Sequence, residues 1–151
     1  MSKIFNILSI EDSEPDFIFI KRSLEQLKNI HFNLLNVKNG RDALFFLYKQ
    51  NGYEKSPDPD IIILDINIPL IDGHEVLKII KNDKNLKIIP VIILSTSESQ
   101  YDINKSYELY ANSYVLKTFD TEDLTNKISI IAEYWLNVNQ LPQKHISFEE
   151  N

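Results

Sequence analysis

Five short apolar segments, separated by stretches of a different periodicity, are the feature of this sequence that most constrains its fold. Four of the five are rich in Ile, Val or Leu and show little alternation, which is typical of parallel strands covered by helices on both faces. The segments are IFNILSI (4–10), FNLLNV (32–37), IIILD (61–65), VIILS (91–95) and SYVLK (113–117). A chain with this pattern is expected to build its core around a parallel sheet.

The stretches between these segments have the periodicity of helices. After Pro15, which suits the first turn of a helix, apolar residues recur at intervals of three and four. The same spacing occurs from Ala43 to Tyr48, from Val76 to Ile80 and from Leu124 to Trp135, and a weaker helical pattern covers Glu98 to Tyr110. Strand and helix thus alternate five times. This predicts an α/β fold, namely a flavodoxin-like, doubly wound (βα)5 domain with a five-stranded parallel sheet in the order 2-1-3-4-5.

Length and composition indicate one domain and exclude several classes of site. The 151 residues are 43% hydrophobic and 25% charged, with a net charge of −6, and so acidic a chain argues against a DNA-binding surface of clustered Lys and Arg. The chain has no cysteine, which excludes disulfides, thiolate zinc sites and a cysteine nucleophile. No apolar stretch approaches the roughly 18 residues that span a bilayer. We therefore expect a cytoplasmic protein that binds neither DNA nor membranes.

Chemically reactive side chains follow the strands at the ends where such folds bind ligands. In an open parallel sheet the binding site lies beyond the carboxyl ends of the strands, near the point where the strand order reverses. At these ends the sequence places Glu11 with Asp12, Asp65, Ser95 with Thr96, and Lys117. Three acids, a hydroxyl and one lysine from distant segments are therefore predicted to meet at one edge.

Three carboxylates at one place need more positive charge than one lysine supplies. At about 4 Å and an effective dielectric constant near 20, two carboxylates repel each other by roughly 4 kcal/mol. Oxygen ligands without His or Cys favour a hard cation such as Mg²⁺, and a lysine with a hydroxyl completes a set that can hold a phosphoryl group. A single Asp at a strand end is more often a turn former, so the prediction rests on four strand ends that carry complementary groups.

Four motifs, taken together and in order, give the chain a resemblance to a known family. They are SIEDSEPD, ILDINIPLIDGHEVL, PVIILSTS and SYVLKTF. With these motifs the chain resembles the receiver domain of two-component response regulators over residues 3–137, which leaves residues 138–151 as a C-terminal tail. The resemblance implies phosphorelay signal transduction, in which a sensor histidine kinase passes a phosphoryl group to the receiver.

The resemblance also implies a role for each residue at the predicted edge. Asp65 matches the phosphoacceptor. Mg²⁺ is expected to be held by Asp65, by Asp12 as a direct ligand, by Glu11 through water, and by the backbone carbonyl of Asn67. The groups expected to respond to the phosphoryl group are the switch hydroxyl Ser95, its neighbour Thr96, the aromatic switch residue Tyr114, and Lys117. The surface from Ser97 to Lys117 is expected to transmit the signal.

The sequence departs from the family pattern at two positions. Thr118 follows Lys117 where the family usually has proline. Because a cis bond before any other residue costs about 2.5 to 4 kcal/mol, we expect a trans Lys117–Thr118 bond and an altered loop at Phe119. Thr96 stands where the family commonly has Ala or Gly, and its larger side chain is expected to hinder the attacking water and slow the loss of phosphate.

Within the family, the chain looks most like the regulators paired with bacterial phytochromes. LDINIP, the loop 51–60 and EYWL near the end carry this likeness, which implies a phytochrome-like sensor kinase as the partner. A homodimer is expected through the surface of the fourth helix, fifth strand and fifth helix, or through the last helix at Tyr134 to Leu136, although aromatic residues at helical spacing are more often core. Asp72 is expected to cap a helix, and His74 to be solvated.

Three rival functions share part of this pattern. A haloacid-dehalogenase-like hydrolase also uses a strand-end Asp with Mg²⁺, but it needs a second Asp where this chain has Asn67, and its nucleophile lies on the first strand. A flavodoxin-like flavin binder needs a Ser/Thr/Gly-rich phosphate loop, which SIEDSE does not provide. A degenerate receiver only binds partners, whereas here every chemical position is filled. We therefore expect a signalling switch that promotes its own phosphoryl transfer and hydrolysis, and not a turnover enzyme.

Overall fold

The computed structural model describes residues 3–143 and places a five-stranded parallel sheet at the centre of the domain. The strands are β1 (Ile4–Ile10), β2 (His31–Val37), β3 (Ile61–Leu64), β4 (Val91–Ser95) and β5 (Ser113–Leu116). Their order is β2-β1-β3-β4-β5, as predicted. Each strand end lies within one residue of its predicted position, so the flavodoxin-like, doubly wound fold is confirmed.

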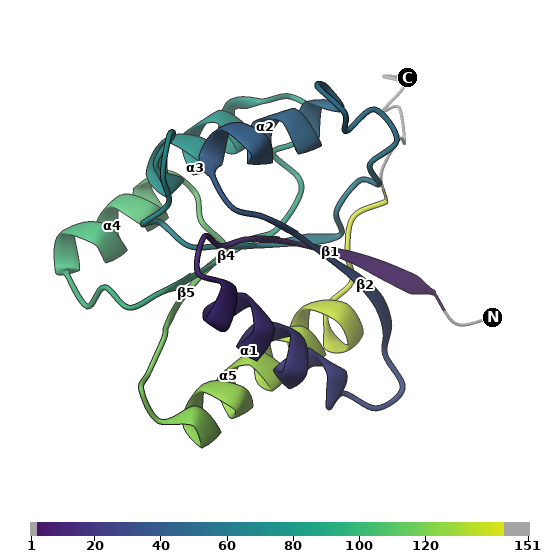
Figure 1. Ribbon diagram of the computed structural model, residues 1–151, viewed down its shortest axis with the longest axis vertical. Coiled ribbons are helices and arrows are strands. Elements are labelled where there is room, and N and C mark those ends of the chain that lie inside the picture. Colours follow the sequence, from purple (N-terminus) through teal and green to yellow (C-terminus); the bar gives the residue numbers. More distant parts are fainter. Residues whose placement is uncertain (1–2, 144–151) are drawn as a thin grey trace.

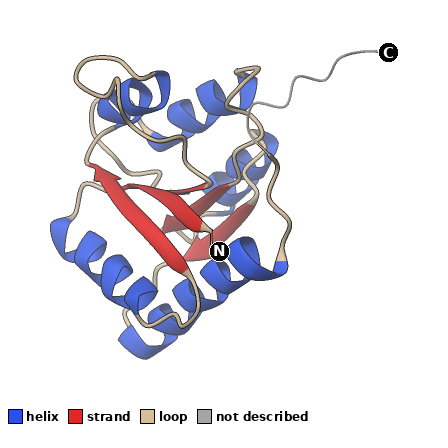
Figure 2. Ribbon diagram, turned by 90° about the vertical axis from the view of Figure 1, so that its right-hand side faces the viewer, coloured by secondary structure: helices blue, strands red, loops and turns tan. Residues whose placement is uncertain are grey.

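Helices cover both faces of the sheet (Figure 1). One face carries α1 (Glu14–Glu25) and α5 (Thr121–Glu133), and the other carries α2 (Gly40–Tyr48), α3 (Gly73–Asn82) and α4 (Gln100–Glu108). A view turned by 90° shows the sheet between these two helical layers (Figure 2). Alternate residues of a strand feed separate cores, so that Leu8 packs with α2 and α3 while Ile7 packs with α1 and α5. None of the described helices combines the length and the apolar content that a membrane crossing requires.

The register of the strands decides which side chains meet at the carboxyl edge. Ile10 of β1 pairs with the residue before Asp65, and the N–H of Asp65 donates to the carbonyl of Ile10 at 3.1 Å. Asp65 therefore leaves the sheet beside Glu11. On the other side, the N–H of Lys117 donates to the carbonyl of Ser95 at 2.7 Å, which extends the β4–β5 pairing by one residue and directs the lysine to the same edge.

Side-chain caps fix where the helices next to this edge begin. Ser13 caps α1 and accepts from the N–H of Asp16 at 3.3 Å, and Asp72 caps α3 and accepts from the N–H of Glu75 at 3.0 Å. The cap at Asp72 confirms the prediction. Because Pro15 lies in the first turn, where its missing N–H breaks no intrahelical bond, α1 can begin directly after the strand-end acids.

The C-terminal end of the last helix differs from the predicted continuous pattern. α5 ends at Glu133 and the chain continues as a π-helix, η1 (Tyr134–Val138). Leu136 is buried, whereas the ring of Tyr134 is about half exposed and packs edge-on against Trp135. Residues 144–151 of the predicted C-terminal tail lie outside the described residues.

Gly73 allows α3 to start against the loop that carries Asp65. Its N–H donates to the carbonyl of Ile66 at 3.0 Å. A Cβ at this position would lie 2.4 Å from the Cα of Ile66 and 2.6 Å from the carbonyl oxygen of Asp65. Both are backbone atoms, so no side chain can move aside to make room. The absence of a side chain at Gly73 therefore helps to hold Asp65 in place.

We predict that Gly73→Ala lowers the free energy of unfolding by about 2 to 3 kcal/mol, because the added methyl group overlaps backbone atoms. Denaturant unfolding followed by circular dichroism measures the change. Lys78→Ala is the matched control, since Lys78 is exposed on the same helix and its replacement should change stability by less than about 0.5 kcal/mol. Equal stabilities of the two variants would contradict the close approach.

Candidate functional site

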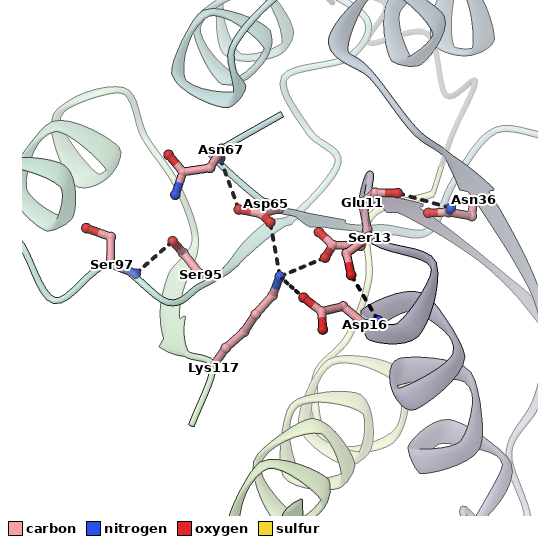
Figure 3. A network of polar contacts seen from close by, with 9 residues as sticks. All are labelled: Glu11, Ser13, Asp16, Asn36, Asp65, Asn67, Ser95, Ser97 and Lys117. Atoms are coloured by element: carbon pink, nitrogen blue, oxygen red, sulfur yellow. Dashed lines mark hydrogen bonds and ion pairs between the residues drawn. The ribbon is translucent and has the colours of Figure 1, made fainter. Parts of the chain in front are cut away.

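One lysine joins three carboxylates at the carboxyl edge of the sheet (Figure 3). The Nζ of Lys117 lies 2.8 Å from Oε1 of Glu11, 3.0 Å from Oδ2 of Asp65 and 3.1 Å from Oδ2 of Asp16. The side chains of Lys117, Glu11 and Asp65 are only 8%, 2% and 11% exposed, so water screens these contacts poorly. An ammonium group has three N–H donors, and here each donor has one carboxylate partner.

An overlapping set of acids at the same place fits a divalent cation. Glu11, Asp12 and Asp65 can each offer one carboxylate oxygen, and these oxygens lie within 4.8 Å of one another. Asp12 is exposed, so the set opens to solvent on one side. Oε2 of Glu11 is buried and has no hydrogen-bond partner among the described residues, which leaves an acceptor for a cation or its water. Donors of this kind suit Mg²⁺ or Mn²⁺.

The loop after β3 fixes the orientation of the Asp65 carboxylate. The N–H of Asn67 donates to Oδ1 of Asp65 at 3.0 Å, while Oδ2 of Asp65 accepts from Lys117. Each oxygen is therefore held by a different partner. Asn67 itself is exposed at the start of the turn, and its backbone carbonyl remains a predicted metal ligand.

Burial and crowding change the proton affinities of the cluster. Burial, and after it the neighbouring Asp65 carboxylate, raise the pKa of Glu11 to about 9, although Lys117 acts in the opposite direction. Burial alone would lower the pKa of Lys117, but hydrogen bonds and charge interactions with Glu11 and Asp65 hold it above its ordinary value. Burial would raise the pKa of Asp16, but the influence of the neighbouring Glu11 and Lys117 outweighs it and lowers that pKa. The raised pKa of Glu11 thus favours its protonated form when no metal is bound, and the raised pKa of Lys117 keeps the lysine charged.

The predicted switch residues contact a common neighbour, Ser97. Ser95 is buried, and its Oγ accepts from the N–H of Ser97 at 3.1 Å. The hydroxyl of Tyr114 donates to the carbonyl of Ser97 at 2.8 Å. Thr96, between the two serines, is exposed. The structure thus links Ser95 and Tyr114 through one residue and leaves the side chain of Thr96 in solvent.

The residue that replaces the family's usual proline does not displace the lysine. No cis peptide bond occurs in residues 3–143, which agrees with the trans Lys117–Thr118 bond expected from the sequence. Oγ1 of Thr118 donates to Oδ2 of Asp123 in the first turn of α5 at 2.9 Å, and Phe119 is fully exposed. The loop is thus tied to α5, and Lys117 still reaches all three carboxylates.

No role was predicted for Asp16, which the structure places against Lys117. Asp16 lies in the first turn of α1, and its side chain is 47% exposed. The available signal is an acid four residues after Asp12, in the first turn of the helix that follows the Glu11–Asp12 pair. An acid at that position is equally expected as a favourable charge at a helix N-terminus, so the pattern alone does not reveal the ion pair.

The prediction that His74 is solvated is wrong. Its side chain is 9% exposed, and its Nε2 lies 3.0 Å from Oγ of Ser106 on α4. His74 is the second residue of α3 and meets a helix that follows much later in the chain. Because that contact depends on how α4 packs, the local sequence around His74 does not encode it.

Comparisons with known proteins give matches along most of the chain. Residues 7–129 match the family described as "Response regulator receiver domain". Response regulator Rcp1 of Synechocystis sp. is 40% identical over 136 residues, which cover 90% of this chain and 92% of Rcp1. FilR2 of Methanothrix harundinacea, which bears the name "Probable methanogenesis regulatory protein", is 37% identical over 138 residues, covering 91% of this chain and 88% of FilR2.

Solved structures agree with these sequence matches. The crystal structure of the Mn²⁺-bound form of Rcp1 has a TM-score of 0.88 at 39% identity and covers 92% of this chain and 99% of that one. The crystal structure of the phosphorylated cyanobacterial phytochrome response regulator RcpA has a TM-score of 0.90 at 35% identity, covering 93% and 100%. These structures thus share the present fold over almost their whole length.

We predict that Mg²⁺ binding releases about one proton at pH 7.5, because the metal-free protein holds a proton on Glu11, whose pKa is raised to about 9, and cation binding favours the ionised acid. Isothermal titration calorimetry in two buffers of different ionisation enthalpy measures the release. The number of protons should fall toward zero above pH 9, where Glu11 is already ionised.

Glu11→Gln is the control for this titration and should release no proton.

The same shift decides how the stability of the fold depends on pH, since the pKa of Glu11 rises from its ordinary value of 4.5 to about 9 on folding. The stability that Glu11 contributes relative to Gln is therefore complete below pH 4.5 and is lost as the pH rises through 9. Equal binding enthalpies of the wild type in both buffers would contradict a protonated Glu11.

Proposed function

The chain belongs to the response regulator receiver domain family, and we propose that Asp65 is the residue that accepts a phosphoryl group from a sensor histidine kinase. One carboxylate oxygen of Asp65 attacks the phosphorus of a kinase phosphohistidine. A new oxygen–phosphorus bond forms, the phosphorus–nitrogen bond breaks, and the departing imidazole takes up a proton. The protein is thereby switched between two states and is not a turnover enzyme.

The observation that supports this proposal most strongly is the 3.0 Å contact between Lys117 and Oδ2 of Asp65 inside the acidic cluster. Phosphorylation adds about −1.5 to −2 charges and three strong acceptors at Asp65. A buried cation already fixed beside the reacting carboxylate stabilises that charge without reorganisation. Ser95, buried at the end of the neighbouring strand, is the proposed hydroxyl donor to a phosphoryl oxygen.

The proposed cation is Mg²⁺, held by the carboxylates of Asp12 and Asp65, by Glu11 through water, and by the backbone carbonyl of Asn67. The oxygen donor set and the unpartnered Oε2 of Glu11 support this assignment. When bound, the ion supplies positive charge to the phosphoryl oxygens. The chain's own groups orient the reactants, since Asn67 holds one oxygen of Asp65 through its N–H and Lys117 holds the other.

Loss of the phosphoryl group is proposed to occur by attack of water on phosphorus, with the carboxylate of Asp65 as the leaving group. Thr96 follows Ser95 directly and is exposed. We place its side chain beside the path of that water, where it slows hydrolysis and extends the lifetime of the phosphorylated state. In this account both uptake and loss of phosphate use groups of the receiver itself.

The site disfavours all three rival functions, namely a hydrolase, a flavin binder and a receiver that only binds partners. Asp65 follows β3 in the middle of the sheet, and Asn67 stands where a haloacid-dehalogenase-like hydrolase needs its second Asp. Glu11 and Asp12 follow β1, where a flavin binder needs a phosphate loop and where two acids repel a phosphate. A receiver that only binds partners has no need for the complete set of acids, lysine and hydroxyl.

The proposed upstream partner is a phytochrome-like sensor histidine kinase. RcpA is named as a cyanobacterial phytochrome response regulator, and the whole length of its structure matches 93% of this chain. FilR2, which is related to a similar degree, bears a name from another process. The proposal of a phytochrome-like kinase therefore rests on the likeness to RcpA. We further propose a cytoplasmic protein without direct contact to DNA or membranes, in keeping with its net charge of −6.

For output we propose the surface from Ser97 to Lys117, and for self-association two alternatives. One is the face formed by α4, β5 and α5. The other is the last helix with η1, where Ile130, Tyr134 and Val138 expose 67%, 49% and 64% of their surface at intervals of four. Apolar side chains repeated along one exposed side of a helix favour a protein contact.

We predict that acetyl phosphate with Mg²⁺ raises the intact mass of the protein by one phosphoryl group. Asp65→Asn should abolish the gain, because an amide oxygen is too weak a nucleophile, and omission of Mg²⁺ should reduce it strongly. Mass spectrometry of the intact chain gives both results.

Asp72→Asn is the matched control, since it removes a carboxylate from the same loop while Asn remains a good helix cap. This variant should be phosphorylated like the wild type. If no donor gave a mass gain, or if Asp65→Asn gained as much as the wild type, the proposed function would be wrong.

Thr96→Ala should lose its phosphoryl group faster than the wild type, by roughly threefold to tenfold, which corresponds to about 1 kcal/mol in the barrier. The decay of the phosphorylated mass after removal of the donor measures the rate. Thr121→Ala, at an exposed threonine on α5, should decay like the wild type. An unchanged or slower decay in Thr96→Ala would count against hindrance of the attacking water.

A further inference from the structure

Helix α4 buries no large apolar side chain of its own, although Leu109 at its C-terminal cap packs against the core. Of its nine residues, the buried one is Ser106. The other two helices on this face bury larger apolar groups, namely Phe46 and Leu47 on α2, and Val76, Leu77 and Ile80 on α3. Because burial of apolar side chains is the main favourable contribution to the packing of a helix, movement of α4 costs less free energy than movement of α2 or α3.

A chain of hydrogen bonds crosses α4 and ends on α3. Oγ of Ser97 donates to Oδ2 of Asp102 at 2.6 Å, and Oγ of Ser106 donates to the carbonyl of Asp102 at 2.7 Å. Nε2 of His74 lies 3.0 Å from Oγ of Ser106. The single hydroxyl proton of Ser106 is used at Asp102, so Nε2 of His74 must carry a proton and donate it. The buried His74 on α3 is thereby joined to the loop that follows β4.

Ser97 connects this chain to the phosphorylation site. Three of its groups are engaged at once, since its N–H donates to Oγ of Ser95, its carbonyl accepts from Tyr114, and its Oγ donates to Asp102. Figure 3 shows the Ser95–Ser97 contact next to Asp65. When the Ser95 hydroxyl turns toward a phosphoryl group on Asp65, the N–H of Ser97 loses its acceptor, and Ser97 is held by one contact fewer.

We propose that Ser97, Asp102, Ser106 and His74 form a polar latch that holds α4 against α3 in the unphosphorylated protein and is released when Ser95 turns away. His74 and Asp102 are positioning residues in this account, since they act on the site only through Ser97. The coupling to phosphorylation rests on the proposed function, whereas the latch itself is a contact of the resting fold. Because it stabilises the resting state alone, weakening it favours the phosphorylated arrangement.

Hydrogen exchange of the α4 amides in the unphosphorylated protein tests the latch without using phosphate. Ser97→Ala and His74→Leu should each raise exchange in residues 101–109 about fivefold, as expected for the loss of one hydrogen bond. His74→Gln keeps an N–H donor and should stay closer to the wild type. Asn104→Ala is the matched control, since it breaks the exposed Gln100–Asn104 hydrogen bond on α4 and leaves the latch intact; its exchange should change by less than about twofold.

The double variant Ser97→Ala with His74→Leu separates a latch from two unrelated contacts. If both residues act in one chain, breaking it twice should add little, and exchange should exceed that of the faster single variant by less than about twofold. Independent contacts would multiply to about 25-fold. Wild-type exchange in both single variants, or multiplication in the double variant, overturns the latch whether or not Asp65 takes up phosphate.

The coupling is tested by the rate at which acetyl phosphate with Mg²⁺ phosphorylates each variant. Ser97→Ala and His74→Leu should be phosphorylated faster by up to about fivefold, and Asn104→Ala at the wild-type rate. A wild-type rate in both latch variants would overturn the coupling. If no variant took up phosphate, the proposed function would fail, and the exchange experiment would still decide on the latch.

Discussion

Both the arrangement of the strand ends and the chemistry of the site depend on the ion pairs of Lys117. Its ammonium group holds Glu11, Asp16 and Asp65 together, and these four residues come from the ends of β5, β1 and β3 and from the start of α1. Two carboxylates about 4 Å apart repel each other by roughly 4 kcal/mol at a dielectric constant near 20. The lysine offsets this repulsion, and the repulsion that remains contributes to the raised pKa of Glu11. Added positive charge therefore favours ionised Glu11, and added negative charge at Asp65 competes for the lysine.

Rigid and movable parts of the domain lie side by side around this cluster. Asp65 extends from a strand whose residues are all buried, and Gly73 packs against the loop that follows it. α4, on the same face of the sheet, buries a serine and is joined to its surroundings by hydrogen bonds. A change of charge at Asp65 is thus more easily accommodated by movement of α4 than by movement of the central strands. Ser97 lies between the two parts and contacts both.

The sequence alone predicts the elements and site residues that depend on local patterns. It does not predict contacts that depend on how distant helices pack. Apolar runs located the strands, and because parallel strands end at the same edge, the meeting of Asp65 with Lys117 followed from them. Asp16 was missed because an acid in the first turn of a helix is common for other reasons. His74 was predicted to be solvated because nothing near it in sequence shows that α4 covers it. Likewise, the π-helix from Tyr134 interrupts a spacing that is typical of a continuous α-helix.

A crystal structure of the chain with Mg²⁺ and beryllofluoride, a phosphoryl analogue, tests the central claim most directly. On our proposal Asp65 takes up the phosphoryl group, and Lys117 and Ser95 respond to it. The predicted result is the analogue on Asp65, in contact with Nζ of Lys117 and Oγ of Ser95, with the N–H of Ser97 no longer bonded to Ser95. An analogue bound elsewhere, or one on Asp65 that leaves the resting contacts of Lys117 and Ser95 unchanged, would contradict the account.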